Sequence, residues 1–372
     1  MNMRKPVLFR VTNNLKVGGV QRRLRALLPL LTERYDVHVV TYKDKGVFFD
    51  ELAAVGVRTH FLPRKGHWDP LAIARLARLF REHKADIVHT HSFGGNIFGI
   101  LAAALARVPV RIGQVHLSEL HWYGSTALRR RKQMLEETLV HRLFTHRVLF
   151  VSRESRDYFQ RHTGLPDSML QVLHNGLDLP DNVEPASREE LGVPAGPKLI
   201  GFVGRLSRGK GVGRFLDMAR EACLQAPGQF HFVVIGDGDG LPRHREWVQG
   251  HGLEGDVTFL GERRDVHRCY EALDCLAFCS DPGVEGMPGV ALEASAHGLP
   301  ILALRTAPME EIKQFFERII FMDDTVPVVA QLERALSLPT ATRERLRNEF
   351  SIEAMRDRTL SLYEELHRQI RP

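Results

Sequence analysis

The stretch CLAFCSDPGVEGMPGVALEASAHGLPILALR, residues 275–305, contains two short apolar runs separated by a loop and a helical segment. The runs CLAFCS and PILALR have the length and composition of buried strands. Pro288 lacks an N–H group and pushes the residue before it out of the helical region. We therefore expect a helix that begins near Pro288 or Gly289 and includes Ala291 to His297. Together these features predict a strand, a loop, a helix and a second, parallel strand.

The same alternation of apolar runs and helical patterns extends over almost the whole chain. The predicted strands are VLFRVT, VHVVTY, RTHFLP, DIVHTHS, VRIGQVH, RVLFVS, KLIGFVG, HFVVIG, VTFLG, CLAFCS, PILALR and RIIFMD. This rhythm is typical of βαβ units and of parallel sheets covered on both faces. Residues 178–197 are rich in proline, glycine and charge, so they predict an interdomain linker with room for one short helix. The expected fold is α/β, with two doubly wound, Rossmann-like domains facing a central cleft.

Composition limits the class of protein. The chain has 372 residues, which at about 150 residues per domain favours two domains. Its net charge of +6 suits an anionic partner such as a phosphate or an acidic membrane surface. The four cysteines form no CxxC pair, and buried free thiols fit a reducing cytosol. The N-terminus does not resemble a signal peptide, and the longest apolar run, FGILAAALA, is too short for a membrane span.

Glu285 and Glu293 flank the predicted start of a helix. A helix N-terminus has free N–H groups and partial positive charge, so it suits a phosphate. Two carboxylates on either side would each bind hydroxyl groups, which gives the order hydroxyl, phosphate, hydroxyl of a nucleotide sugar. The alternative is two solvated glutamates at a helix start, where acidic residues are common.

The loop GRLSRGKG, from Gly204 on, lies between a predicted strand and a predicted helix. It matches the first seven positions of a P-loop, but Gly211 stands where a Ser or Thr would bind Mg²⁺. The cations Arg205, Arg208 and Lys210 indicate instead an anion site in which side chains take the place of a metal. The alternative is a solvated basic turn.

Three further motifs have simpler structural explanations. IGDGDG, residues 235–240, fails both the calcium-loop pattern and GxGxxG, so we expect a tight turn between a strand and a helix. His89 and His91 lie on one face of a predicted strand, and two histidines do not complete a zinc site. A packed or cleft-facing pair is the expectation for them, and His116 at another strand end resembles them. We predict no metal at the site.

The first half of the chain carries a basic surface. Gly18 and Gly19 precede the first predicted helix and permit close approach of a ligand to the backbone. That helix is rich in arginine, and ALRRRK, residues 127–132, adds a second basic cluster. A solvated face is the default reading, but the excess charge also suits lipid headgroups or an anionic acceptor.

The chain resembles the retaining nucleotide-sugar glycosyltransferases of family 4 in eight motifs and in their order. The motifs are GGVQR, DIVHTHS, VSRES, HNGLD, GRLSRGKG, VIGDGDG, FLGERRDV and EGMPGVALEASAHGLPI. The resemblance covers nearly the whole chain and implies the GT-B fold. The most specific motif of the family is Glu-x7-Glu, and Glu285 and Glu293 have its spacing. The implied domains are 1–180 for the acceptor, 197–350 for the donor, and 351–372 as a C-terminal helix that crosses back to the first domain.

The resemblance also implies roles for individual residues. The donor would be bound by Gly18, Gly19, Arg205, Lys210, Gly261, Arg263, Glu285, Gly289, Val290 and Glu293. The catalytic residues would be His116, Arg205, Lys210 and Glu285. Arg205 and Lys210 would bind the diphosphate together with the N–H groups of Gly289 and Val290. Glu285 would bind the sugar, and Glu293 the ribose.

Function is expected to follow the family: transfer of a sugar to a glycan or lipid-linked acceptor in cell-surface polysaccharide or lipopolysaccharide assembly. No cofactor, metal or nucleic acid is expected, and the enzyme would be cytoplasmic and peripheral on the membrane. A nucleotide-sugar 2-epimerase or a catalytically silent binding subunit of the same fold are the alternatives. The family's Gly-Gly turn is missing near Thr306, although Glu310 or Glu311 would replace the usual acidic residue. The shape of the donor pocket's outer wall is therefore not predicted.

Overall fold

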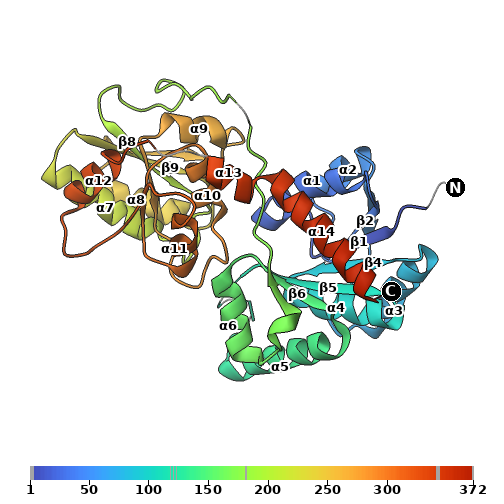
Figure 1. Cartoon of the computed structure of the whole chain (residues 1–372). Coiled ribbons are helices and arrows are strands. Elements are labelled where there is room, and N and C mark those ends of the chain that lie inside the picture. Colours follow the sequence, from blue (N-terminus) through green and yellow to red (C-terminus); the bar gives the residue numbers. More distant parts are fainter. Residues whose placement is uncertain are drawn as a thin grey trace. The chain divides into compact units, whose positions relative to one another are not determined.

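The computed structural model describes residues 4–117, 119, 121–122, 124–180, 182–340 and 344–370. Position 181 of the predicted linker and positions 371 and 372 of the predicted C-terminal helix lie outside the described residues. The chain forms two compact units: the first comprises the residues up to Asp178 and those from Glu349 on, and the second runs from Leu179 to Asn348. Each unit contains one sheet in which all paired strands are parallel (Figure 1), which confirms the α/β class.

The first unit has a seven-stranded sheet of order β3-β2-β1-β4-β5-β6-β7. Its strands are β1 (Val7–Thr12), β2 (Asp36–Thr41), β3 (Arg58–Phe61), β4 (Ile87–His91), β5 (Val110–Val115), β6 (Arg147–Phe150) and β7 (Leu170–Val172). Its helices are α1 (Gly19–Leu31), α2 (Phe48–Ala54), α3 (Pro70–Glu82), α4 (Ser92–Leu105), α5 (Ala127–Phe144), α6 (Arg153–Thr163) and α14 (Ile352–Ile370), with a short 3₁₀ turn η1 (Asp167–Met169). The strand order reverses between β1 and β4, which is the point where doubly wound sheets bind ligands.

Apolar side chains cover both faces of this sheet. On one face, leucines of α1 and residues of α2 and α14 pack against Leu8, Val39 and Ile112 of the strands. On the other face, α3 and α4 pack against Phe9 and Val88. Strands buried on both faces read as continuous apolar runs, which is why the sequence predicted them well.

The C-terminal helix α14 belongs to the first unit although it is the last element of the chain. Its residues Met355, Leu362 and Tyr363 lie in the same core as α1. Immediately before it, Leu177 and Ser351 form an isolated parallel bridge. The predicted return of the last helix to the first domain is therefore confirmed.

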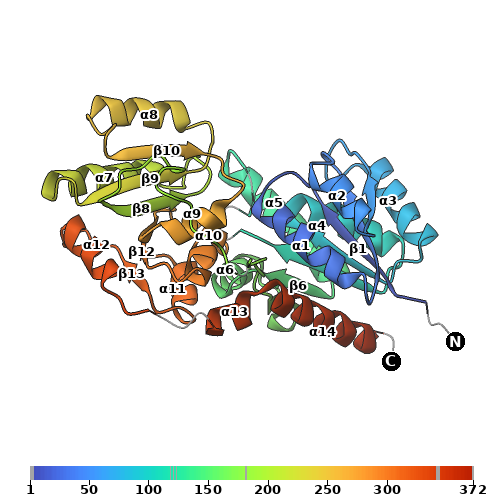
Figure 2. The same ribbon diagram turned by 90° about the horizontal axis from the view of Figure 1, so that it is seen from above.

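The second unit has a six-stranded sheet of order β10-β9-β8-β11-β12-β13. Its strands are β8 (Lys198–Val203), β9 (Phe230–Ile235), β10 (Val257–Gly261), β11 (Cys275–Phe278), β12 (Ile301–Ala303) and β13 (Ile319–Phe321). Its helices are α7 (Val212–Gln225), α8 (Leu241–Gly250), α9 (Val266–Ala272), α10 (Gly289–Ala296), α11 (Ala307–Lys313) and α12 (Val328–Leu336), followed by α13 (Glu344–Phe350) at the border of the units. Figure 2 shows α9, α10 and α11 on the opposite side of this sheet from α7 and α12.

Every run predicted as a strand contains one, but two details differ from the sequence analysis. β7 was not predicted, because three residues are too few to show a periodic pattern. The described part of the linker contains no helix: residues 188–192 form turns, with the Leu191 N–H bonded to the Ser187 carbonyl. Thr306, at the missing Gly-Gly turn, has an extended backbone (φ −137°) and precedes α11 directly. Among the described residues, no helix is both long and apolar enough to cross a bilayer.

Candidate active site

The loop after β8 is closed by a glycine that allows no side chain. Gly211 has φ +79° and stands at the N-terminus of α7. A Cβ atom at this position would lie 1.9 Å from the carbonyl oxygen of Cys279. A Ser or Thr therefore does not fit here, and the loop is not a P-loop for a steric reason as well as by its sequence.

Lys210 and Glu285 are 75 residues apart in sequence but adjacent in the structure. The Nζ of Lys210 forms an ion pair with Oε1 of Glu285, and both side chains are partly buried. Both residues line a small cavity together with Gly204, Ser280 and Val290. The two residues predicted to contact the donor phosphate and the donor sugar thus share one site.

Helix α10 begins at Gly289, as the position of Pro288 predicts. The N–H groups of Gly289 and Val290 lie in its first turn, where no intrahelical acceptor exists. Glu293 follows in the second turn, and its Oε2 accepts a hydrogen bond of 3.0 Å from the hydroxyl of Tyr270. The Tyr270 side chain is 1% exposed, so it fixes the position of this carboxylate from within the unit.

The remaining predicted donor residues of the second unit differ in what they contact. Arg205 is exposed and makes no side-chain hydrogen bond to any residue that the structure describes. Arg263 donates two hydrogen bonds, of 2.8 and 2.7 Å, to the carboxylate of Asp265. Gly261 has φ +68°, and its carbonyl accepts from the N–H of Gly236. Arg205 is therefore free to bind an anion, whereas the guanidinium of Arg263 already has a partner.

The IGDGDG segment forms the tight turn between β9 and α8 that the sequence predicted. Gly236 has φ +138°, and a Cβ atom there would lie 1.9 Å from the carbonyl oxygen of Gly204. The N–H of Leu206 bonds to the carbonyl of Asp237. The turn thus packs against the start of the basic loop and supports its backbone.

In the first unit, Gly18 and Gly19 stand at the N-terminus of α1. Gly18 is fully extended (φ −179°), so its conformation does not require glycine. A Cβ atom on Gly18 would lie 2.5 Å from Oε1 of Gln21, the end of a flexible side chain that can move aside, so space does not require glycine either. The close approach of a ligand to these two glycines stays a prediction.

His116, which follows β5, belongs to a chain of hydrogen bonds. Arg10 Nη1 lies 3.1 Å from His91 Nε2, and His91 Nδ1 lies 2.9 Å from His116 Nε2. Burial first, and then the neighbouring charges of His89 and Arg10, lower the pKa of His91 well below its usual value. Burial first, and then Arg23, do the same for the pKa of His116. Both imidazoles are therefore neutral at pH 7.

The direction of this hydrogen-bond chain follows from Arg10. A guanidinium can only donate, so Nε2 of His91 accepts, and Nδ1–H of His91 donates to Nε2 of His116. The proton of His116 is consequently on Nδ1. This atom is buried and has no hydrogen-bond partner among the described residues. His116 thus carries a neutral N–H group whose hydrogen bond no described residue accepts.

The sequence analysis missed Arg10, Tyr270 and the buried Glu137 of α5. Glu137 accepts hydrogen bonds from His121 (2.7 Å), Trp122 (2.8 Å) and Asn96 (2.9 Å). These bonds join His121, Trp122 and Asn96 of α4 to the carboxylate of Glu137. No motif marks these residues, because their partners lie on other elements. His89 and His91, by contrast, form the packed pair that was expected, with ring centroids 4.9 Å apart.

Comparisons with known proteins agree with this geometry. The model of Glycosyltransferase Family 4 matches residues 17–180, and that of Glycosyl transferases group 1 matches residues 197–337. Two parallel α/β units with a basic loop and a helix N-terminus at the strand ends define the class of GT-B glycosyltransferases. This chain belongs to glycosyltransferase family 4.

Relatives and solved structures extend the match. EpsF of Bacillus subtilis (strain 168) is 26% identical over 312 residues, which cover 81% of this chain and 80% of that protein. The UDP-Gal:alpha-D-GlcNAc-diphosphoundecaprenol alpha-1,3-galactosyltransferase of Escherichia coli is 27% identical over 77% of this chain and 76% of that protein. The crystal structure of Anabaena HepE in complex with UDP and glucose covers 96% of this chain and 99% of that chain, with a TM-score of 0.79 and 20% identity. This last likeness concerns the fold.

Proposed function

We propose that this glycosyltransferase moves a sugar from a UDP-sugar to a hydroxyl group of a glycan or lipid-linked acceptor, with retention of configuration and without a metal ion. The observation that carries the proposal is the shared cavity of Lys210, Glu285 and Val290. A cation, a carboxylate and a helix N-terminus at one cavity match the phosphate and hydroxyl groups of a nucleotide sugar.

The chemistry follows from where charge develops. Cleavage of the bond between the anomeric carbon and the diphosphate oxygen leaves an anion and an oxocarbenium-like sugar. Lys210, Arg205 and the N–H groups of Gly289 and Val290 would stabilise this anion electrostatically. Loss of one such group typically costs roughly 10²–10³ in rate. Because these groups supply the positive charge, a metal is not required.

The side chain of Lys210 pairs with that of Glu285 in the structure. On donor binding, the diphosphate would take over Lys210, and the carboxylate of Glu285 would accept from sugar hydroxyl groups. Glu293 would bind the ribose, and the turn from Gly261 to Arg263 would border the base. From the first unit, Gly18 and Gly19 would approach the phosphates, and Nδ1–H of His116 would donate to the sugar.

Retention would come from attack on the same face that the diphosphate leaves. The acceptor oxygen forms the new bond to the anomeric carbon, the diphosphate departs with the bonding electrons, and the acceptor proton moves to a phosphate oxygen. No protein nucleophile is needed. The anomeric configuration of the product, measured by NMR, tests this step, and a glycosyl adduct on the protein in mass spectrometry would contradict it.

The donor base and the acceptor class are inferred from similar proteins. HepE was crystallised with UDP, and the name of the E. coli relative specifies a UDP-galactose donor and a lipid diphosphate acceptor. These names support a UDP-sugar donor and a lipid-linked acceptor. A role in polysaccharide or lipopolysaccharide assembly on the cytoplasmic face of the membrane is part of the same proposal.

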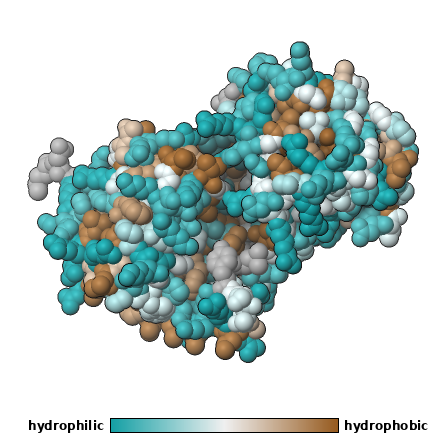
Figure 3. All heavy atoms as spheres, turned by 180° about the vertical axis from the view of Figure 1, so that it is seen from behind, coloured by the Kyte–Doolittle hydropathy of each residue, from teal (hydrophilic) through white to brown (hydrophobic). Residues whose placement is uncertain are grey.

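Helix α5 of the first unit supports a membrane surface as a partner. Four leucines of α5 are 49–79% exposed: Leu128, Leu135, Leu139 and Leu143. Successive leucines are seven, four and four residues apart, which places them on one side of the helix. Glu137 and His141 are buried on the opposite side. Basic residues flank the leucines: Arg129, Arg130, Arg131, Lys132 and Arg142. Figure 3 shows apolar side chains along the lower edge of the first unit, where α5 lies in Figure 1. A leucine stripe between cations suits anionic lipid.

Thermal unfolding with UDP, GDP and ADP, each with and without EDTA, tests the donor site. A nucleotide at about 100 times its Kd adds about 2.7 kcal/mol of stability. We expect a shift with UDP that EDTA leaves unchanged and that Lys210→Ala or Arg205→Ala reduces. Lys198→Ala, which removes an exposed lysine paired with Asp274 in the same unit, is the matched control. A shift that requires Mg²⁺ would contradict the metal-free site.

Product analysis separates the rival functions. Incubation with UDP-sugar alone would yield an epimerised sugar from a 2-epimerase, whereas a transferase needs the acceptor. A catalytically silent subunit would bind UDP but release none from UDP-sugar with any acceptor extract.

Sedimentation with lipid vesicles tests the membrane surface. We expect the double variant Leu135→Ser, Leu139→Ser to lose binding to vesicles that contain phosphatidylglycerol, while Leu224→Ser retains it. Leu224 is 72% exposed in the second unit. Equal binding by all proteins would contradict a role of α5.

A further inference from the structure

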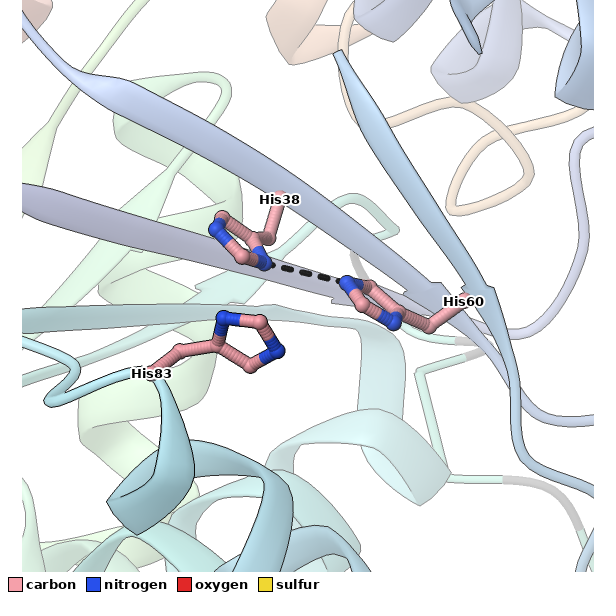
Figure 4. A group of neighbouring side chains, drawn as sticks. All are labelled: His38, His60 and His83. Atoms are coloured by element: carbon pink, nitrogen blue, oxygen red, sulfur yellow. Dashed lines mark hydrogen bonds between the residues drawn. The ribbon is translucent and has the colours of Figure 1, made fainter.

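Three histidines from three elements of the first unit meet in one place. His38 is the third residue of β2, His60 is the third residue of β3, and His83 follows the last residue of α3. One ring nitrogen of each lies within 4.8 Å of the other two. Figure 4 shows the three rings converging, with His38 Nδ1 and His60 Nε2 joined by a contact of 3.0 Å.

The backbone fixes this arrangement. In the parallel pair of β2 and β3, His38 is opposite Arg58 and His60 is opposite Val40, so the two histidines are two residues out of register and share a face. α3 ends at Glu82 with His83 as its C-cap residue, and Lys84 then adopts a left-handed conformation with φ +53°. The Arg4 side chain bonds to the His83 carbonyl and holds this end of the helix.

Imidazole nitrogens bind a metal ion through their lone pairs. His38 Nδ1 and His60 Nε2 already face each other at 3.0 Å, and a bound ion would take the place of the proton between them. The His83 side chain makes no hydrogen bond to any residue that the structure describes.

The surroundings supply an orienting carboxylate. Oδ1 of Asp36 lies 3.6 Å from Nε2 of His38, the ring nitrogen that faces away from the other histidines. This Nε2 is buried and has no hydrogen-bond partner among the described residues, so Asp36 is its nearest carboxylate without being bonded to it. A carboxylate behind a metal-binding histidine is the usual arrangement of outer ligands, and it raises the basicity of the imidazole. The charge of Asp36 also offsets that of Arg58, 3.1 Å away.

We propose that His38, His60 and His83 bind one Zn²⁺ ion, with water as the fourth ligand. Three imidazoles without a thiolate suit a divalent transition metal. At Zn–N distances of about 2.0–2.1 Å, tetrahedral ligands lie about 3.3 Å apart. The observed spacing of 3.0 Å between the nitrogens of His38 and His60 is close to this value. The nitrogen of His83 lies within 4.8 Å of both, so its ring would move toward the ion on binding. His60 and His83 are partly exposed, so an ion can enter and their rings can rotate.

This zinc site is separate from glycosyl transfer. The histidines lie on β2, β3 and the end of α3, whereas the predicted donor residues of this unit follow the ends of β1 and β5. An ion would link two strands to a helix and thereby stabilise the first unit. It would not replace Lys210 or Arg205, which belong to the other unit, so the inference does not depend on the proposed function.

The test uses tag-free protein, stripped with EDTA, dialysed and loaded with ZnSO₄. We expect one zinc per chain by elemental analysis after gel filtration, and a rise in Tm of about 5 °C or more at 100 times Kd. Co²⁺ in place of Zn²⁺ would give visible bands of a tetrahedral, thiolate-free site. His60→Gln and His83→Gln each replace a partly exposed ring, so the fold should survive, and both should abolish the bound zinc and the Tm rise. His162→Gln, at an exposed histidine of α6, is the matched control.

Two outcomes would overturn the proposal. One is a wild-type protein that retains no stoichiometric zinc and shows no Tm rise. The other is equal zinc retention by wild type, His60→Gln and His83→Gln. UDP binding, measured on the same samples, should be the same with and without zinc. Failure of UDP binding would therefore count against the donor site and not against the zinc site.

Discussion

His91 donates its Nδ1–H to Nε2 of His116 at 2.9 Å, and Arg10 on the far side of His91 sets the direction of this bond. Arg10, which is buried in β1, thus determines which nitrogen of His116 carries the proton. Four predictions follow from this and similar relationships.

The pH profile should report the neutral state of His116. Its pKa is lowered well below the usual value by burial, then by Arg23, His121 and Arg10. The neutral donor form is populated above this lowered pKa, so kcat/KM should stay level from pH 8 down to pH 6 and fall only at more acidic pH. Arg10→Met removes one of the charges that lower the pKa, so its acidic limb should move to higher pH.

The control for this profile is Arg22→Met, an exposed arginine of α1, which should leave the limb in place. Circular dichroism checks that Arg10→Met is folded. A wild-type limb near the ordinary histidine pKa of about 6.5, or an identical limb in Arg10→Met, would show that the proton of His116 is set in another way.

Tyr270→Phe should weaken the binding of the sugar donor without slowing the chemical step. The change removes the hydroxyl that donates to Glu293, the carboxylate proposed to bind the ribose. Loss of one hydrogen bond costs about 1 kcal/mol, so KM for the donor should rise roughly fivefold while kcat is retained. Tyr35→Phe, at a buried tyrosine of the first unit, serves as the control. A fall in kcat with an unchanged KM would argue against a positioning role.

Glu137→Gln should lower the stability of the first unit. Burial alone raises the pKa of Glu137, but the charges and hydrogen bonds of His121 and His141 hold it well below the usual range. This stabilisation is present above the unfolded pKa and is lost as the pH falls through the lowered one. Breaking a buried charge pair costs about 3–5 kcal/mol, so Tm should fall clearly at pH 7.

Glu136→Gln provides the comparison for Glu137→Gln, since Glu136 is the next residue of α5 and its carboxylate lies 3.4 Å from His67. Its Tm should change little. If both variants unfold at the wild-type temperature, the Glu137 cluster does not contribute to stability.

Gly211→Ala should destabilise the second unit by about 2 kcal/mol or more, because the new Cβ meets the Cys279 carbonyl and the backbone is left-handed. Gly213→Ala, two residues further on in α7, meets no atom within 4 Å and should be neutral or stabilising by up to about 1 kcal/mol. Thermal unfolding of both variants measures the difference. Equal Tm values would show that the loop can rearrange.

The sequence by itself determined every strand except β7, the two-unit organisation and the start of α10. Buried parallel strands leave continuous apolar runs, and Pro288 marks a helix start through its own covalent geometry. The motifs around Lys210 and Glu285 could be recognised in the sequence because each lies within one short segment.

Only the tertiary structure decided which distant residues meet. Arg10 reaches His91 because β1 and β4 are neighbours in the sheet, although 81 residues separate the two. His38 meets His60 for the same reason, across the paired strands β2 and β3. Tyr270 of α9 reaches Glu293 of α10, and His83 at the end of α3 joins the two histidines, because the helices pack on the sheets. Sheet order and register place such side chains together, and no spacing along a single segment encodes that.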